Sequence, residues 1–428
     1  MPVHRTIFEG RSRKHVVFSL ILVAFTMVII EVSAYLGLAI IDFIRPYRPV
    51  DWSQHHPYEK PDPNTASNWI LSPGFRQTFR KELDWLKERS DAALGLIRKA
   101  GNDIGIEKDQ VIFQINSAGF KGPEMNVHGK CLRILAIGDS CTFGTHFDYF
   151  SYPRSLDRSL CAAGVDAEVV NGGVEGYGCV NVLWRMAHFK AVKPDITLIL
   201  LGWNVIYGDL EFKRFPLWTM GFVAKVARFA RSKLRDPLEQ AADLYAKPKH
   251  PVRASREVVH LESYVPERFV GQLAQIVTQM RSTGSRVVLM TLPGLFVMEE
   301  ARPADQALKK GHLPHFTDNP YVLAKLTDRY NQAIRAAAQR FGTGLIDLDQ
   351  WSRSALRPRH TYFRDSVHLT PRGQEAIGAF LAIRLQRLFP RAMNRYRIGR
   401  EPLRPSAVGR TAASVADPSP HFKLLYCE

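Results

Sequence analysis

Residues 132–144 read LRILAIGDSCTFG, and this stretch indicates the fold of the domain around it. Six residues with strand character end abruptly at Gly138-Asp139-Ser140. A short apolar run that stops at a glycine is typical of a buried strand in a parallel sheet. In open α/β sheets, ligands bind at the carboxyl ends of the strands. The serine of this turn is therefore expected where a nucleophile would act.

An alternation of strands and helices continues from this stretch. Strands are predicted at residues 132–137, 167–170, 196–201, 286–292 and 344–348, and helices at 152–163, 180–192, 266–283 and 321–341. A last helix is predicted to end near residue 388, because Thr370 can cap its start and Pro371 suits the first helical position. Five strands that alternate with helices indicate an α/β domain with a parallel five-stranded sheet.

The 428-residue chain is basic, with a formal net charge of +17. Basic residues concentrate near the N-terminus, at 213–256 and in the C-terminal tail. Such a charge suits nucleic acid or an anionic membrane surface. Because no nucleic-acid-binding motif is present, we expect no nucleic-acid partner and favour the membrane. The 5 cysteines include no C-x-x-C pair, which argues against a zinc site and leaves disulfide pairing open.

Residues 15–44 are predicted to be a transmembrane anchor that follows a basic cytoplasmic N-terminus at 1–14. About 20 apolar residues span a bilayer, and basic residues are more numerous before the segment than after it. A signal peptide cleaved near Val32-Ser33-Ala34 is the alternative, which we favour less because apolar residues continue to Ile41. Both interpretations place the domain outside the cytoplasm.

The rest of the chain divides by composition. Residues 45–130 are expected to decorate the domain, with an extended linker that lies on the domain at 45–75, a helix at 78–100 and a strand at 111–116. The domain itself is expected at 131–390 with an insertion at 205–260, and a disordered basic tail at 391–428. A helix with one basic face is predicted within the insertion. It either packs on the domain, which we favour, or lies on a membrane surface.

Four short motifs follow predicted strands or precede the last helix. They are Gly138-Asp139-Ser140, Asn171-Gly172-Gly173-Val174-Glu175-Gly176, Gly202-Trp203-Asn204 and Asp365-Ser366-Val367-His368. Their residue types suit acyl transfer, because Ser140 needs a base, which His368 can be, and Asp365 can orient that histidine. The backbone N–H groups of Ser140 and Gly176 and the side-chain amide of Asn204 can stabilise an oxyanion.

This set of motifs resembles the SGNH, or GDSL-type, hydrolase family over roughly residues 132–388. The resemblance implies a flavodoxin-like three-layer α/β/α sandwich and no metal or organic cofactor. It assigns Ser140 as the nucleophile, His368 and Asp365 as its triad partners, and Gly176 and Asn204 as oxyanion residues. Gly173 is a second candidate for the oxyanion glycine.

Two residues depart from the family pattern. Val205 stands where the family usually has aspartate, and Cys141 where it usually has leucine. We expect Cys141 to pack beneath the nucleophile and Asp139 to stabilise the turn rather than act as an acid. His55 and His56 are expected on the surface.

The predicted function is that of a bacterial, membrane-anchored serine esterase with its catalytic domain on the periplasmic or extracellular side. Its substrate is expected to be an acetyl or short-chain acyl ester, such as an acylated carbohydrate. One alternative is O-acetyl transfer to an envelope polysaccharide, with a membrane acyl donor protein as partner. Another is a non-catalytic carbohydrate-binding or assembly protein with the same fold.

Overall fold

The computed structural model describes residues 15–26, 29, 56–87, 91–103, 105–126, 130–144, 147–208, 261, 264–300, 302–314 and 316–398. The chain divides into two compact units, residues 1–55 and 56–428. Most of the predicted insertion, including its basic helix, lies outside the described residues, as do the N-terminal 14 residues.

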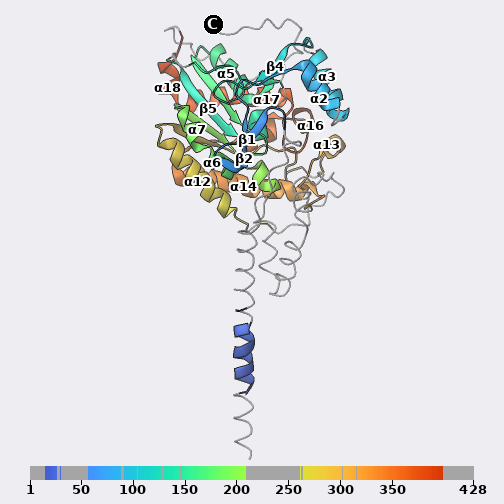
Figure 1. The fold of residues 1–428 in the computed structure, drawn as a ribbon, viewed down its shortest axis with the longest axis vertical. Helices are drawn as coiled ribbons and strands as arrows, with labels where there is room; N and C mark the ends of the chain where they lie inside the picture. The colour runs from blue at the N-terminus through green and yellow to red at the C-terminus, as the bar shows by residue number, and fades with distance from the viewer. Residues whose placement is uncertain are drawn as a thin grey trace, which may run out of the picture. The chain divides into compact units, whose positions relative to one another are not determined.

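A five-stranded parallel sheet forms the centre of the second unit (Figure 1). Its strands are β5 (Leu132–Gly138), β6 (Ala167–Gly173), β7 (Ile196–Leu200), β8 (Arg286–Met290) and β9 (Gly344–Ile346). They lie in the order β6-β5-β7-β8-β9, and every neighbouring pair is parallel. This is the strand order of flavodoxin-like sheets, in which ligands bind where the order reverses. The predicted parallel sheet is confirmed.

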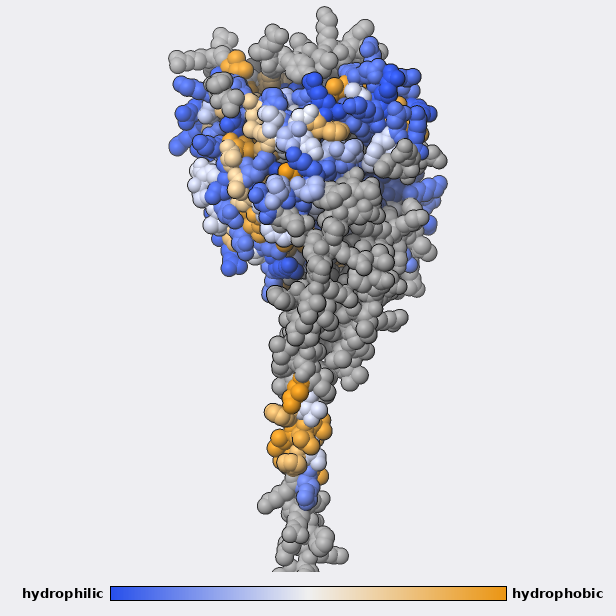
Figure 2. Space-filling model, viewed as in Figure 1, coloured by the Kyte–Doolittle hydropathy of each residue, from blue (hydrophilic) through white to orange (hydrophobic). Residues whose placement is uncertain are grey.

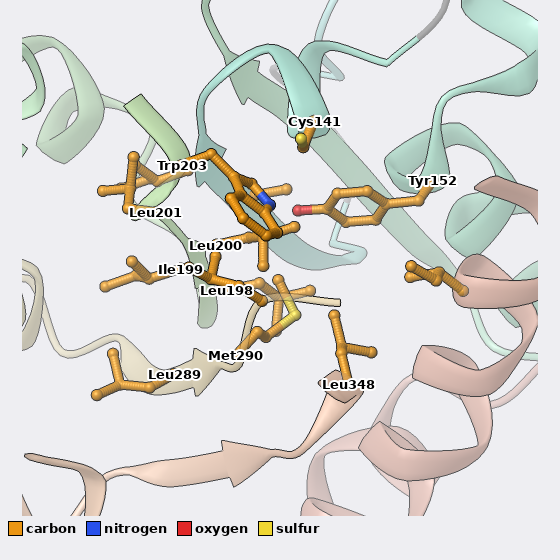
Figure 3. Close-up of a cluster of buried hydrophobic side chains, with 14 of the residues drawn as sticks. Cys141, Tyr152, Leu198, Ile199, Leu200, Leu201, Trp203, Leu289, Met290 and Leu348 are labelled. Carbon is orange, nitrogen blue, oxygen red and sulfur yellow. The ribbon is translucent and has the colours of Figure 1, made fainter. Parts of the chain in front are cut away.

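The strand β5 is apolar because it is buried on both faces. Ile134, Leu135, Ala136 and Ile137 have no exposed surface. A strand covered on both sides shows a continuous apolar run rather than alternation. Figure 3 shows the buried cluster that side chains of β7 and β8 form, with Tyr152 and Cys141 beside it.

Two groups of helices cover the sheet. The helix α5 (Tyr152–Ala162) packs against α17 (Pro371–Leu388). On the other side, α12 (Glu267–Arg281) packs against α6 (Cys179–Trp184), α7 (Met186–Ala191) and α14 (Pro320–Phe341) (Figure 1). As predicted, Thr370 caps α17 by accepting the N–H of Gly373, and Pro371 follows it. The predicted helix at 180–192 is two helices that meet at Arg185.

The segment before the sheet is built from short antiparallel strands. The hairpin β1 (Glu59–Asp62) and β2 (Thr65–Leu71) forms one pair, and β3 (Arg76–Thr78) with β4 (Val111–Gln114) forms another. The helices α2 (Phe79–Lys87) and α3 (Asp91–Asp103) lie between β3 and β4 in sequence, where one helix was predicted.

The predicted extended linker at 45–75 is therefore wrong from residue 59 onward. Tyr58 and Leu71 are each 1% exposed and belong to the core. The polar composition was misleading because Asn68 is buried with its hydrogen bonds satisfied: its amide donates to Asp62, and its carbonyl accepts from Asn181. A buried polar side chain with partners does not require a solvated loop.

The predicted disordered tail begins too early at residue 391. The helix α18 (Pro390–Arg395) is followed by a bridge between Arg397 and Val165, and the N–H of Ile398 donates to Gly164 O at 2.8 Å. These backbone pairs attach the segment to the domain, and residues beyond 398 lie outside the described part. The remaining short helices are α4 (Ser140–Phe143), η2 (Asp148–Phe150), α8 (Trp203–Tyr207), α13 (Asp305–Lys310), α15 (Leu348–Ala355) and α16 (Arg359–Tyr362).

In the first unit, residues 15–26 are helical, and their large apolar side chains, such as Phe18 and Phe25, are exposed. Figure 2 shows this helix as mostly hydrophobic, whereas the visible coloured surface of the second unit is mostly hydrophilic. The rest of the predicted anchor at 15–44 lies outside the described residues, apart from residue 29. Across the part of the chain that the structure describes, no helix has the length and apolar character needed to cross a membrane.

Candidate active site

Ser140 begins α4 directly after the central strand β5. The carboxylate of Asp139 caps this helix by accepting the N–H of Cys141 at 2.9 Å. Asp139 is fully buried, and this burial raises the pKa of its carboxyl group to about 6. Its position agrees with the predicted role in the turn. Cys141 is buried as predicted, with Sγ 3.6 Å from the carbonyl oxygen of Val367.

The structure brings Ser140 together with the two residues predicted to activate it. Ser140 Oγ lies 2.7 Å from His368 Nε2, and His368 Nδ1 lies 2.8 Å from Asp365 Oδ2. Because an ionised aspartate only accepts hydrogen bonds, Nδ1 carries the proton and Nε2 is left to accept the serine hydroxyl. The arrangement can therefore remove the proton from Ser140.

The electrostatic surroundings of Asp365 favour its charged form. Burial alone would raise the pKa of this carboxyl group, but the His368 imidazole and its hydrogen bonds, together with the Arg364 guanidinium, lower it below its ordinary value. The Nε of Arg364 lies 3.6 Å from Asp365 Oδ2. Asp365 can therefore stabilise an imidazolium on His368.

Local hydrogen bonds explain the spacing of three residues between Asp365 and His368. Asp365 Oδ1 accepts the backbone N–H groups of Val367 at 3.0 Å and His368 at 2.7 Å. The N–H of Arg364 donates to His368 O at 2.9 Å and closes the loop. One carboxylate thus shapes the backbone turn with one oxygen and contacts the imidazole with the other.

This loop is also tied to its neighbours. Ser366 O accepts the N–H of Leu295 at 2.8 Å, and Ser366 Oγ accepts the N–H of His312 at 2.8 Å. On the other side, the amide of Gln374 in α17 donates to Cys141 O at 3.3 Å. The two halves of the site are therefore held together although they lie 228 positions apart in sequence.

The register of the sheet places the other two loops on either side of Ser140. Gly138 pairs with Gly173 at the end of β6 and with Leu200 at the end of β7. The carboxyl ends of these three strands therefore meet at one edge. The segment 174–178 follows β6, and Asn204 follows β7 in α8.

The predicted oxyanion glycine is better supported at Gly176 than at Gly173. The N–H of Gly173 donates to Asn171 Oδ1 at 3.0 Å, so it is already used. Within the described residues, no acceptor is found for the backbone N–H groups of Ser140 and Gly176. Gly176 has φ +76°, a conformation that favours glycine.

Asn204 lies beside the same loop. Its Nδ2 donates to Tyr177 O at 3.0 Å, and an amide nitrogen has a second hydrogen to offer. Val205, which stands in place of the usual aspartate, is partly buried against the core. Its Cγ2 lies 3.5 Å from the point that a Cβ at position 178 would occupy. At this position Val205 makes an apolar contact, and the neighbouring Asn204 amide has its own hydrogen bond to Tyr177 O.

No motif in the sequence predicts the residues that hold the Gly176 loop. The indole N–H of Trp69 donates to Glu175 O at 3.0 Å, and the Tyr58 hydroxyl donates to the Glu175 carboxylate. His56, predicted on the surface, is partly exposed; its Nε2 lies 3.1 Å from this carboxylate and its ring stacks on Tyr58. His55 lies outside the described residues. These contacts could be found only in the folded structure, because Trp69, Tyr58 and His56 lie more than 100 residues before Glu175 in the sequence.

The described residues contain no group of three or more His, Cys, Asp or Glu side chains that could hold a metal ion. Cys131, Cys141 and Cys179 are free thiols. Burial raises the pKa of the Cys141 thiol well above its ordinary value, which favours the protonated form.

A model of the GDSL-like lipase/acylhydrolase family matches residues 136–376. The match covers more than half of the chain and contains all four motifs. The chain belongs to the GDSL-like lipase/acylhydrolase family. No curated protein matches the sequence.

Solved structures similar to this acylhydrolase-family chain include three named hydrolases. The acetyl xylan esterase AlAXEase is 15% identical, with a TM-score of 0.36, and the match covers 60% of this chain and 98% of that one. A putative GDSL-like lipase from Parabacteroides merdae is 16% identical, with a TM-score of 0.37 and coverage of 62% and 100%. The lipase/acylhydrolase from Enterococcus faecalis is 16% identical, with a TM-score of 0.37 and coverage of 60% and 96%. The family assignment rests on the family model and not on these likenesses.

Proposed function

We propose that this protein is a serine esterase that hydrolyses acetyl or short-chain acyl esters through an acyl-enzyme. The observation that carries the proposal is the chain of two contacts, 2.7 Å from Ser140 Oγ to His368 Nε2 and 2.8 Å from His368 Nδ1 to Asp365 Oδ2. A hydroxyl within hydrogen-bond reach of an oriented base is the arrangement that activates a serine nucleophile.

In the first half-reaction, Ser140 Oγ forms a bond to the acyl carbon while its proton moves to His368 Nε2. The oxyanion that develops accepts hydrogen bonds from the N–H groups of Ser140 and Gly176 and from Asn204 Nδ2. When the intermediate collapses, the ester C–O bond breaks, and the leaving alcohol takes the proton from His368. The acyl group stays on Ser140.

In the second half-reaction, water attacks the acyl-enzyme while His368 removes its proton. Collapse then releases the carboxylic acid and returns the proton to Ser140. A sugar hydroxyl in place of water would give acetyl transfer instead of hydrolysis. The hydrolase and transferase chemistries share every residue named here, so they are distinguished by the acceptor alone.

A fluorophosphonate probe tests the nucleophile. We expect the wild-type protein to be labelled once, and Ser140→Ala to abolish both labelling and hydrolysis of p-nitrophenyl acetate. Ser282→Ala, which removes a hydroxyl at the end of α12, is the matched control and should behave as wild type. A folded wild-type protein that is neither labelled nor active would contradict the proposal and favour the non-catalytic alternative.

We also propose that residues 15–44 anchor the enzyme in a bacterial cytoplasmic membrane with its domain outside. The proposal is supported by the exposed apolar side chains of the helix at 15–26, because a helix that is apolar all round suits lipid. Carbonate extraction of membranes should leave the full chain in the pellet. A deletion of residues 1–44 should release it, and a pelleted deletion would contradict the anchor.

A further inference from the structure

Gly176 contributes to the site through a backbone group whose direction must be fixed. Its N–H belongs to the same peptide unit as the carbonyl of Glu175. A trans peptide unit is planar, and its C=O and N–H point in opposite directions. A group that holds the Glu175 carbonyl therefore also sets the direction of the Gly176 N–H.

Trp69 holds this carbonyl. The Nε1–H of its indole donates to Glu175 O at 3.0 Å, from a strand 106 positions earlier in the sequence. The hydrogen bond also polarises the peptide unit, which strengthens the N–H on its other side as a donor. Trp69 thus acts on the peptide unit of Gly176 from outside the central sheet.

The indole ring also restricts the glycine itself. A Cβ at position 176 would lie 2.8 Å from Trp69 Cζ2, which is closer than a carbon contact allows. A glycine is therefore needed for this close approach, but glycine also leaves the backbone free to rotate. The ring and the hydrogen bond together remove that freedom.

Trp69 is in turn fixed by its surroundings. It pairs with Pro61 across the hairpin β1–β2, and the Tyr177 hydroxyl donates to its carbonyl oxygen. The rings of Trp69 and Tyr177 meet edge to face with centroids 5.5 Å apart. Asn204 Nδ2 donates to Tyr177 O on the far side of the loop. The carbonyls of Glu175 and Tyr177, the residues on either side of Gly176, are therefore held by Trp69 and by Asn204.

We propose that Trp69 is a positioning residue of the esterase, which directs the Gly176 N–H toward the developing oxyanion. The inference rests on the proposed function, since it assigns Trp69 to that same site. It makes the N-terminal hairpin β1–β2 a part of the active site rather than a decoration of the domain. Trp69 needs no contact with the substrate for this role.

The test is Trp69→Phe, which keeps an aromatic ring and removes only the N–H donor and one ring. Loss of an oxyanion donor lowers kcat by about 10²–10³-fold, so misdirecting one should lower it by about 10–100-fold. KM should stay within about threefold, because the donor acts in the transition state. The rate of fluorophosphonate labelling should fall with kcat, because the phosphoryl oxygen needs the same donors. Trp351→Phe, at a tryptophan that stacks on Phe380 in another part of the domain, is the matched control and should keep the wild-type kcat.

The outcomes separate this inference from the proposed function. An active wild type with an unchanged kcat in folded Trp69→Phe overturns the role of Trp69 and leaves the esterase intact. A wild type without esterase activity overturns both. If Trp69→Phe does not fold, as circular dichroism would show, Tyr177→Phe replaces it, because it removes the hydroxyl that holds the Trp69 backbone. A selective fall in kcat in Tyr177→Phe supports the proposal, and an unchanged kcat overturns it.

Discussion

The two sides of the site are attached to the protein in different ways. On the nucleophile side, Ser140 and His368 lie in turns that are built by their own local hydrogen bonds and are tied directly to the central sheet and to α17. On the oxyanion side, Gly176 lies in a loop that a tryptophan from the N-terminal hairpin holds in place. The first side depends on local turn chemistry, and the second depends on packing between distant segments.

The difference predicts which mutations should affect the chemical step and which should affect the structure that supports it. The nucleophile side should respond to changes of the reacting groups with large losses of activity and little loss of stability. The oxyanion side should respond to changes in residues that never touch the substrate. The predictions below test this contrast from the largest effect to the smallest.

The largest effects are expected at His368 and Asp365. Asp365→Asn keeps an oxygen for the turn but places an amide N–H against His368 Nδ1, which forces the wrong tautomer. We expect kcat to fall by about 10³–10⁴-fold, and His368→Ala to lower it at least as far. Steady-state hydrolysis of p-nitrophenyl acetate measures both variants.

Asp305→Asn, at an exposed position in α13, is the matched control and should leave kcat unchanged. The double variant Ser140→Ala/His368→Ala should be no less active than Ser140→Ala alone, because the two residues act as one unit. A further loss of activity in the double variant would argue against that coupling.

An intermediate effect is expected at Asn204, which contacts the Gly176 loop on the oxyanion side. Asn204→Ala removes an oxyanion donor and also frees the carbonyl of Tyr177. We expect kcat to fall by about 10²–10³-fold with a small change in KM. Asn394→Ala, on an exposed face of α18, controls for the loss of an amide. A change confined to KM would mean that Asn204 binds substrate without stabilising the oxyanion.

The smallest effect is expected in the hairpin, at Glu59, and it concerns stability. Burial, followed by the nearby charge of Glu175, raises the pKa of the Glu59 carboxyl group to about 7. Between its ordinary value and 7, the folded state binds more protons than the unfolded state, so stability falls as the pH rises through this window. Glu59→Gln does not titrate and should therefore gain stability relative to wild type, by about 1–3 kcal/mol between pH 4.5 and pH 7.5.

Thermal unfolding of both proteins across this pH range measures the difference. Glu267→Gln, in the first turn of α12, is the matched control and should follow the wild-type curve. If the difference in stability between Glu59→Gln and wild type stays constant with pH, the pKa of the Glu59 carboxyl group is not raised in the folded state.

Most of the central domain could be predicted from the sequence because its signals are local. The strands β5, β7 and β8 are short, mostly apolar runs, and Thr370 with Pro371 marks the start of α17 within one residue. The four motifs were expected at the ends of strands, and the structure brings Ser140, His368 and Asp365 within hydrogen-bond distance. The helix break at Arg185 and the hairpin at 59–71 were missed because neither has a periodic apolar pattern.

The parallel sheet and the strand ends follow from the sequence because apolar periodicity and turn chemistry act between near neighbours, and the reacting groups follow from the four motifs and their resemblance to the family. The sequence favoured Gly176 over Gly173, but which N–H remains unused, and what directs it, can be seen only in the folded structure. Gly173 and Gly176 look alike in sequence, but Asn171 occupies the first while Trp69 orients the peptide unit of the second. The Asn171 contact is local, but the Trp69 contact joins segments 106 residues apart, which only folding brings together.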